Sequence, residues 1–307
     1  ATGAPPPLPT VRELLPAEPQ LPALEVVDAG AFDLVLDAGR LNQAHHGMAQ
    51  SGPLDAPAAR LANRLCGNAP GTPLVESVLT GPTLRALRDV VVGAAGAGLR
   101  LEVDGDPVGV ATTRVRAGSM VRLRPTGTGA RGYLAVAGGI ESDVVLGSAS
   151  VDRFGLLGRP LRAGDVLGLA QEAAHGERLR VALPTPDPAV VLRLRPGPQW
   201  SQAAQDALLA APFAVTIGDR MGVRLAGPEV PGGELLSESP PPGAVQVPAG
   251  GAPILLLNDR MRSAGYDKPC VLHPADLARA AQLRTGDAIR FAMDVEPHPV
   301  PWYRDLS

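Results

Sequence analysis

Short apolar runs separated by turn residues make up most of the chain. They are rich in Val, Leu and Ile and end at glycine or proline, as in LEVV, FDLVL, DVVVGAAG, MVRLRP, YLAVAGG, VLRLRPGP, FAVTI, AVQVP and PILLLND. Runs of this length bounded by turn residues indicate β-strands and are too short to predict helices. We therefore predict a mainly β chain built from barrels or sandwiches.

A hairpin and a few helices stand out within this pattern. The segment LRLEVDGDPVGV holds two alternating runs around Asp104-Gly105, a pair that tolerates the positive φ of a tight hairpin turn. Asp55 comes directly before the first helical stretch, where aspartate is favoured as the N-cap. Helical periodicity is confined to residues 56–68, 201–211 and 274–284.

A short internal repeat suggests that the chain has two related halves. The segment PLRAGDVLGLA at residues 160–170 resembles QLRTGDAIRFA at residues 282–292, and each follows an apolar strand at a similar distance. Duplicated β domains would produce this spacing. Chance would also produce it, because this turn is common before a strand, so both explanations stay open at this point.

We expect four segments along the chain. Residues 1–23 are rich in proline, which removes backbone donors, and are predicted to be an extended or disordered leader. Two β domains follow at residues 24–188 and 189–295, and residues 296–307 form a tail. A length of 307 residues is consistent with about two domains.

Composition and charge argue against several classes of function. The formal net charge of −3 and a calculated pI near 6.0 predict that nucleic acid is not a partner. Cys66 and Cys270 are far apart and outside any C-x-x-C spacing, so they predict buried thiols in a reducing compartment. No signal pattern or long apolar window occurs, so we expect a cytoplasmic protein without membrane contact.

Two stretches resemble ligand sites but carry weak signals. His45 and His46 would face opposite sides of a strand, and no third ligand follows at a suitable spacing, so no metal site is predicted. The segment from Gly93 to Gly98 lacks the Lys-Ser/Thr end of a phosphate loop, so ATP binding through it is not expected. The chain also has no G-x-S-x-G elbow.

The triplet Asp-Arg-Met occurs twice, each time after an apolar strand. The triplets begin at Asp219 and Asp259, and the second lies in NDRMRSAGYDKP, which also holds the only lysine, Lys268. An arginine beside an aspartate can simply fix its loop through an ion pair, and a lone lysine can reflect an arginine-rich composition. The same groups suit recognition of a small amide, urea-like group or carboxylate, with arginines holding oxygens and an aspartate accepting N–H.

The candidate site therefore centres on the second triplet. Asp259 is predicted to act as acid, base or amide acceptor, and Lys268 to pair with substrate charge, since burial lowers the pKa of lysine more readily than that of arginine. The predicted substrate-binding residues are Arg40, Glu76, Asp219, Arg220, Glu238, Arg260, Gly265 and Tyr266.

Several segments, taken in order, resemble one family. They are DAGRLNQAHHGMAQSGPLD, ARLANRLCGN, ESVLTGP, YLAVAGGIESDVVLGSAS, LRPGPQ, GDRMGVRLAGP, GAVQVP and NDRMRSAGYDKPCVL. Over about residues 25–292 the set resembles the C subunit of 5-oxoprolinase, a family also described as biotin-dependent carboxyltransferase, allophanate hydrolase subunit 2 or Kip-type antagonist. The resemblance implies two cyclophilin-like β-barrel domains with a few short helices.

The resemblance implies one main function and two alternatives. The main one is membership of an ATP-dependent 5-oxoprolinase complex, which converts 5-oxo-L-proline to L-glutamate and also contains a Kip-inhibitor-like subunit and a TIM-barrel-like subunit. ATP would be bound by one of these partners. The first alternative is a non-catalytic antagonist of a Kip-type histidine-kinase inhibitor. The second is a carboxyltransferase that uses carboxybiotin, carried on another protein, and a urea-like substrate.

Two departures from the family pattern concern the substrate. Asn42 stands where the family usually has glycine, and residues 262–266 read RSAGY where the family often has T-T-G-G-Y. The added arginine and the alanine are expected to narrow or recharge the pocket. They bear on substrate identity more than on fold.

Overall fold

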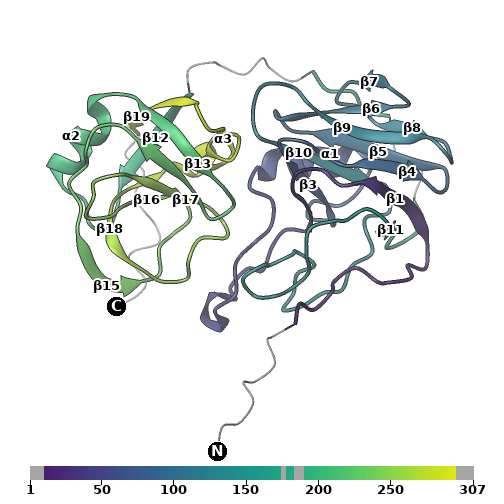
Figure 1. The fold of residues 1–307 in the computed structure, drawn as a ribbon, viewed down its shortest axis with the longest axis horizontal. Helices are drawn as coiled ribbons and strands as arrows, with labels where there is room; N and C mark the ends of the chain where they lie inside the picture. Colours follow the sequence, from purple (N-terminus) through teal and green to yellow (C-terminus); the bar gives the residue numbers. More distant parts are fainter. Residues whose placement is uncertain (1–9, 174–177, 183–189, 295–307) are drawn as a thin grey trace, which may run out of the picture.

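The chain forms two β domains that lie side by side (Figure 1). This computed structural model describes residues 10–173, 178–182 and 190–294. The predicted domain boundary near residue 188 and the predicted tail lie outside these ranges. The prediction of a mainly β chain with a few short helices is confirmed.

No helix among the described residues is both long and apolar enough to cross a membrane.

Two antiparallel sheets make up the first domain. The strands of one are β1 (Pro22–Asp28), β4 (Thr83–Ala86), β6 (Leu99–Val103), β7 (Asp106–Val108), β9 (Met120–Pro125) and β11 (Val166–Gly168). The strands of the other are β2 (Asp33–Leu36), β3 (Leu74–Val78), β5 (Val90–Ala95), β8 (Thr113–Val115) and β10 (Arg131–Val136). Their spatial orders are β11-β1-β4-β9-β6-β7 and β2-β3-β10-β5-β8. The predicted hairpin is β6–β7, with Asp104 and Gly105 at φ 52° and 93° in its turn.

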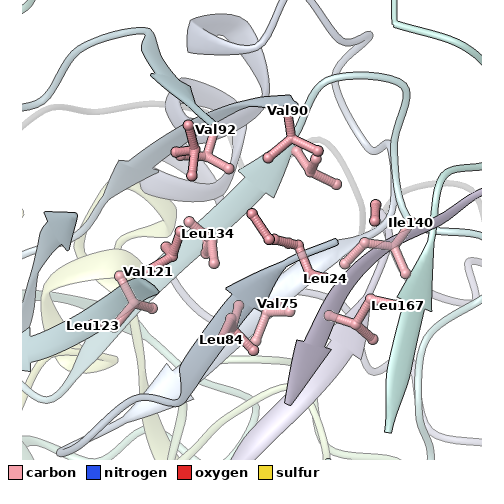
Figure 2. Close-up of a cluster of buried hydrophobic side chains, with 14 of the residues drawn as sticks. Leu24, Val75, Leu84, Val90, Val92, Val121, Leu123, Leu134, Ile140 and Leu167 are labelled. Atoms are coloured by element: carbon pink, nitrogen blue, oxygen red, sulfur yellow. The ribbon is translucent and has the colours of Figure 1, made fainter. Parts of the chain in front are cut away.

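Apolar side chains from both sheets fill the space between them. Leu24 of β1 and Leu84 of β4 share this core with Val75 of β3 and Val92 of β5 (Figure 2). Successive side chains of a strand alternate between faces, so every second residue can serve the core. β10 is buried along its whole length because α1 (Ala56–Leu65) covers its other face.

The second domain is a closed barrel. Its strands are β12 (Val190–Pro196), β13 (Phe213–Gly218), β14 (Gly222–Ala226), β16 (Ala244–Val247), β17 (Ile254–Leu256), β18 (Ala264–Leu272) and β19 (Ala288–Met293). They are ordered β12-β19-β13-β14-β17-β16-β18, and β18 pairs back with β12. β15 (Glu234–Glu238) pairs with β18 outside this ring, and α2 (Gln202–Ala210) lies beside the barrel. Closure leaves no free edge within the ring.

The two segments of the internal repeat form the same turn. Gly164 at φ 91° donates its N–H to Val26 of β1, and Gly286 at φ 93° donates to Val215 of β13, both at 2.8 Å. The carbonyl of the aspartate that follows each glycine accepts from the same partner residue, at 2.8 and 2.9 Å. The shared hydrogen bonding supports duplicated β domains over chance.

The helices occur where the periodicity predicts them, with one shortened. Asp55 caps α1 by accepting from Ala58 N at 3.0 Å, as predicted. The third helical stretch forms only η2 (Pro274–Asp276) and α3 (Leu277–Ala280). At Gln282 and Leu283 the N–H groups bond three residues back instead of four, and the Gln282 side chain bonds to the first domain. A further short helix, η1 (Ala44–His46), was not predicted.

In the segment predicted to be an extended or disordered leader, the residues after 9 have little regular secondary structure but pack against the first domain. Leu14 is 2% exposed and packs with Leu34, Leu36 and Val151. The backbone of this segment is also bonded, since Asp143 N donates to Leu14 O at 2.7 Å. Apolar burial at Leu14 outweighs the preference of a proline-rich segment for an extended solvated chain. Residues 1–9 lie outside the described ranges.

The segment before α1 joins the two domains. Leu54 belongs to the first domain by sequence but is 6% exposed in the core of the barrel. Asn258 Nδ2 donates to Ser51 O at 3.1 Å and to Pro53 O at 3.3 Å, and Gln282 Nε2 donates to Asp55 Oδ2 at 2.7 Å. The barrel core is therefore completed by a side chain from the other domain.

Leu54→Ala is expected to lower the free energy of unfolding by about 2–4 kcal/mol, because it leaves a cavity in the barrel core. Urea unfolding monitored by circular dichroism measures the change. Leu41→Ala serves as the control, because Leu41 is exposed on the adjacent loop and should change stability by less than about 0.5 kcal/mol. Equal small effects for both variants would contradict the role of Leu54.

Candidate functional site

The two Asp-Arg-Met triplets meet at the junction of the domains. Arg220 lies in the turn between β13 and β14, and Asp259 lies in the loop after β17. The guanidinium of Arg220 donates from Nε and Nη2 to the two carboxylate oxygens of Asp259, at 2.7 and 3.1 Å. The sequence allowed an ion pair inside each triplet, but the arginine of the first triplet instead pairs with the aspartate of the second. This ion pair fixes both loops.

Arg220 also reaches into the first domain. Its Nη1 donates to Glu76 of β3, and its Nη2 donates to Gly52 O at 2.7 Å. The side chain is buried. Most of its donors are therefore used inside the protein, so Arg220 serves as a fixed bridge between the domains.

Glu76 is the buried acid at the other end of this bridge. Its Oε2 accepts from Leu54 N at 3.1 Å and from the Tyr133 hydroxyl at 2.8 Å. Arg131 Nε lies 3.8 Å from its Oε1. Two arginines, a hydroxyl and a backbone N–H thus surround one carboxylate, which compensates for its removal from water.

The electrostatic environment keeps this network ionised. Burial raises the pKa of Glu76, but the charges of Arg220 and Arg131 more than offset it, so the pKa lies below its ordinary value. Burial lowers the pKa of Arg220, and Glu76 and Asp259 reverse that effect to give a raised pKa. Burial and then the charge of Glu76 raise the pKa of Tyr133 well above 10.0, so its hydroxyl stays a donor.

Two cavities adjoin the network and share Asp219 and Met221. The first, the interdomain cavity, has a volume of about 300 Å³ and is lined by Phe32, Val78, Arg131, Arg153, Phe154, Gly218, Asp219, Arg220, Met221 and Asp259. The second, the barrel cavity, has a volume of about 320 Å³ and lies among Ile217, Asp219, Met221, Gly222, Arg224, Ser237, Pro240, Gln246, Ile254, Leu256, Arg260, Met261, Ser263, Ala264, Gly265 and Tyr266. Both volumes suit a small ligand.

Larger hollows of about 620 and 750 Å³ lie elsewhere. One lies along β5 and β8, and the other lies between α1 and α3. Neither is lined by a residue of the two triplets, so we place the candidate site at the two smaller cavities.

Six of the predicted site residues line these two cavities. Arg220 and Asp259 line the interdomain cavity, and Asp219 lines both. The other three, Arg260, Gly265 and Tyr266, line the barrel cavity. The structure thus divides the predicted site into two adjoining spaces with Asp219 between them.

Lys268 lies away from both cavities, and its predicted role toward a substrate stays a prediction. Its side chain is 0% exposed, and its Nζ donates to Tyr266 O at 2.6 Å and lies 2.9 Å from Glu238 Oε1. Glu238 also accepts from Gln199 Nε2 at 2.9 Å, and the hydrogen bond from Lys268 lowers its pKa. Neither Lys268 nor Glu238 lines the two cavities. The pair joins β15 to β18 and has a structural role.

Arg40 and Glu76, also predicted to bind substrate, are buried and line neither cavity. Arg40 is buried, and its Nε and Nη2 donate to Val145 O at 3.1 Å and to Ser148 O at 3.2 Å. Burial lowers its pKa. Glu76 is buried behind Arg220 and lines neither cavity. Both were predicted from polar residue type, which does not reveal which side of a loop or strand they face.

Sequence reasoning missed several residues of the junction. Arg131 of β10 donates from Nη1 to Ala281 O of the other domain, and Tyr133 bonds Glu76. Arg262 donates to Met48 O at 3.0 Å and so joins the loop after β17 to the loop that carries η1. Arg131 in RGYLAV and Arg262 in DRMRS lie next to apolar strands in the sequence. Nothing in the sequence indicated that their side chains contact the other domain or a distant loop.

The barrel cavity contains an arginine with an unusual environment. Burial, and then the charge of Arg262, lower the pKa of Arg260 to about 10. Arg260 Nε donates to Pro240 O at 2.7 Å. The remaining donors of a partly desolvated cation suit an anionic or carbonyl oxygen.

Metal and cysteine chemistry find no support at this site. Within the described ranges, no three His, Cys, Asp or Glu side chains are grouped as a metal ion requires. His45 and His46 are exposed on η1. Both cysteines are buried as predicted, and burial raises the pKa of each thiol to about 12. The arrangement instead suits recognition of a small polar molecule by fixed carboxylates and guanidinium groups.

The fold and this arrangement agree with one family of protein domains. Residues 46–293 match the model described as carboxyltransferase domain, subdomain A and B, and the chain belongs to this family. The match includes the two triplets and, apart from Phe32, all residues that line the two cavities.

Particular relatives resemble the chain over most of its length. It is 34% identical over 285 residues to the C subunit of 5-oxoprolinase from Escherichia coli, covering 87% of this chain and 90% of that protein. It is 31% identical to the C subunit of 5-oxoprolinase from Haemophilus influenzae, with the same two coverages. A putative urea carboxylase of Emericella nidulans is 29% identical, and the match covers 89% of this chain but 24% of that protein.

Solved structures share the fold. The crystal structure of TTHA0988 superposes with a TM-score of 0.92 at 49% identity, covering 95% of this chain. This chain spans 60% of the length of that chain. The Kluyveromyces lactis urea amidolyase superposes with a TM-score of 0.82 at 26% identity, over 90% of this chain and 19% of that one.

Glu76→Gln is expected to lower the free energy of unfolding by about 3–5 kcal/mol near neutral pH, because it leaves buried arginine charge uncompensated. The folded-state pKa of Glu76 lies below its unfolded value near 4.3, so the ionic contribution is present above about pH 5. It is lost as the pH falls through the folded-state pKa. Urea unfolding at several pH values should therefore show the gap between wild type and variant narrowing in acid.

Glu25→Gln provides the control for this measurement. Glu25 lies 3.6 Å from Arg85 in a partly exposed ion pair, for which we expect a change below about 1 kcal/mol. If Glu76→Gln were no more destabilising than Glu25→Gln, the buried network would not hold the domains together.

Proposed function

We propose that this chain is one component of an ATP-dependent 5-oxoprolinase that hydrolyses 5-oxo-L-proline to L-glutamate. The observation that carries the proposal is the similarity, over nearly the full length of both proteins, to two proteins named as the C subunit of 5-oxoprolinase. The chain acts with partners, for which a Kip-inhibitor-like subunit and a TIM-barrel-like subunit are the candidates. It contributes the site for the lactam.

The lactam binds in the interdomain cavity. Arg220 holds both oxygens of Asp259, so this carboxylate has a fixed orientation toward the cavity it lines. Its remaining lone pairs can accept the lactam N–H without reorganisation of the loop. Asp259 is therefore assigned the role of amide acceptor.

Asp219 is the second carboxylate of the cavity and is assigned the role of general base. Its Oδ1 accepts from Met221 N at 2.7 Å and Gly222 N at 2.9 Å, which fixes the carboxylate while the residue stays exposed. In the net hydrolysis the lactam C–N bond breaks, water oxygen joins the carbonyl carbon, and the nitrogen gains a proton. A carboxylate beside the carbonyl can accept the proton of that water.

ATP is assigned to one of the partners, because the glycine-rich stretch of this chain has a packing role. A Cβ on Gly93 of β5 would lie 2.5 Å from Leu65 Cβ, and one on Gly98 would lie 2.4 Å from Arg131 N. These glycines allow close approach of α1 and β10, and they do not form a loop with free N–H groups for phosphate. We therefore derive no step on ATP from this chain.

Mixing this chain with its Kip-inhibitor-like and TIM-barrel-like partners is expected to give 5-oxoproline-dependent release of ADP, and omission of this chain should abolish it. A coupled assay for ADP measures the rate. Asp259→Ala is expected to lower kcat/KM by about 100-fold or more, because the substrate loses its fixed amide acceptor.

Two measurements make this result decisive. Size-exclusion chromatography of the mixture shows whether the variant still associates with its partners, and Asp206→Ala on the exposed face of α2 is the matched control. Full activity without this chain would overturn the proposed function. Loss of association by Asp259→Ala would instead make this loop an interface, as expected of an antagonist that only binds its partner.

A second candidate is transfer of a carboxyl group from carboxybiotin to a urea-like amide. The matches to urea carboxylase and urea amidolyase, and the name of the family model, favour it. The same carboxylates and guanidinium groups suit urea, and the biotin would be carried by another protein. Inhibition of the reconstituted activity by avidin would support this candidate, whereas the lactam hydrolase should be insensitive to avidin.

A further inference from the structure

We propose that Arg153 binds the carboxylate of an acidic lactam at the mouth of the interdomain cavity and so selects 5-oxoproline over uncharged amides. The inference rests on the proposed function and adds a specificity-determining residue to it. Arg153 lies outside every segment that the sequence singled out for chemistry.

A rigid turn presents Arg153 to the cavity. The preceding residue, Asp152, is buried, and its Oδ1 accepts from Phe154 N at 3.1 Å and Gly155 N at 2.9 Å. Its Oδ2 accepts from Ala49 N at 2.8 Å, which ties the turn to the loop that carries η1. The backbone that carries Arg153 is therefore fixed before any ligand arrives.

The guanidinium of Arg153 is available to a ligand. Its Cζ lies 5.2 Å from the centroid of the Phe32 ring, which is a cation–π contact. Among the described residues, no carboxylate pairs with it and no hydrogen bond engages its side chain. The edge of a guanidinium matches a carboxylate with two parallel hydrogen bonds.

The other arginines of the cavity are already neutralised. Arg220 is bonded to Asp259 and Glu76, and Arg131 lies between Glu76 and a backbone carbonyl. Arg153 is therefore the cavity's uncompensated positive charge within the described chain. An anionic group entering the cavity is attracted to Arg153 and repelled by Asp219 and Asp259.

These charges give the substrate one orientation. The carboxylate of 5-oxoproline lies at the mouth on Arg153, and the lactam N–H lies deeper on Asp259. Phe154, which is 65% exposed and also lines the cavity, offers an apolar face to the ring at the same mouth. Urea has no anionic group for Arg153, so the residue separates the two substrate classes of the family's relatives by charge.

The test compares 5-oxoproline with its uncharged carboxamide in the assembled complex. For the wild type, kcat/KM should be much higher for the acid than for the amide. Arg153→Gln should raise KM for the acid about 10-fold to 100-fold, leave kcat within about threefold, and leave the amide nearly unchanged. The acid-to-amide preference should therefore collapse, which a purely structural role for Arg153 would not produce.

Two further variants sharpen the result. Arg153→Lys keeps the charge but loses the planar fork and should retain part of the preference. Arg290→Gln, on an exposed position of β19 outside the cavity, is the matched control and should retain all of it. Thermal melts of all three variants check that the fold is intact.

The outcomes separate the two proposals. A wild-type complex that releases no ADP with 5-oxoproline overturns the proposed function and this inference with it. A wild-type complex that is active, combined with an unchanged acid-to-amide preference in Arg153→Gln, overturns only the role of Arg153.

Discussion

One buried chain of alternating charges determines how the two domains are arranged. Asp259, Arg220 and Glu76 are linked from the loop after β17, through the turn after β13, to β3 of the other domain. A buried guanidinium between two carboxylates is tolerated only if both partners stay in place, because the desolvation of each charge is large. Any movement of one domain against the other would break hydrogen bonds on both sides of Arg220. The cavity beside it is therefore built into the interface.

This constraint also shapes the chemistry. Arg220 is paired with Glu76 and Asp259, so the carboxylate of Asp259 is a fixed hydrogen-bond acceptor in the interdomain cavity. Within the described chain, the unpaired cation of this cavity is Arg153, which lies at its mouth. A ligand thus meets the positive charge of exposed Arg153 at the mouth, and the largely buried carboxylate of Asp259 lies deeper inside. Such an ordered field positions a molecule that carries both an acid and an amide, whereas binding in the reverse orientation would bring like charges together.

Much of the fold could be predicted from the sequence, but only part of the site. Short apolar runs predicted the strands, and the repeated R-x-G-D turn suggested two related halves, because both are local properties of the chain. The two triplets were recognised as a site. The sequence did not show that Arg220 pairs with Asp259 instead of its neighbour, or that Lys268 faces Glu238 inside the protein. Arg153 was missed because its availability depends on which arginines elsewhere are already paired.

The insertion of Leu54 into the barrel core has a consequence for the order of events during synthesis. Leu54 and Glu76 leave the ribosome long before Arg220, Asn258 and the barrel strands that receive them. Until those strands exist, the first domain carries an exposed leucine and an acid without its main counter-ion. Domains fold as the chain emerges from the ribosome, so the first domain lacks its contacts with the barrel until the barrel has been synthesised. Completion of the barrel then covers Leu54, and the Arg220 side chain reaches Glu76.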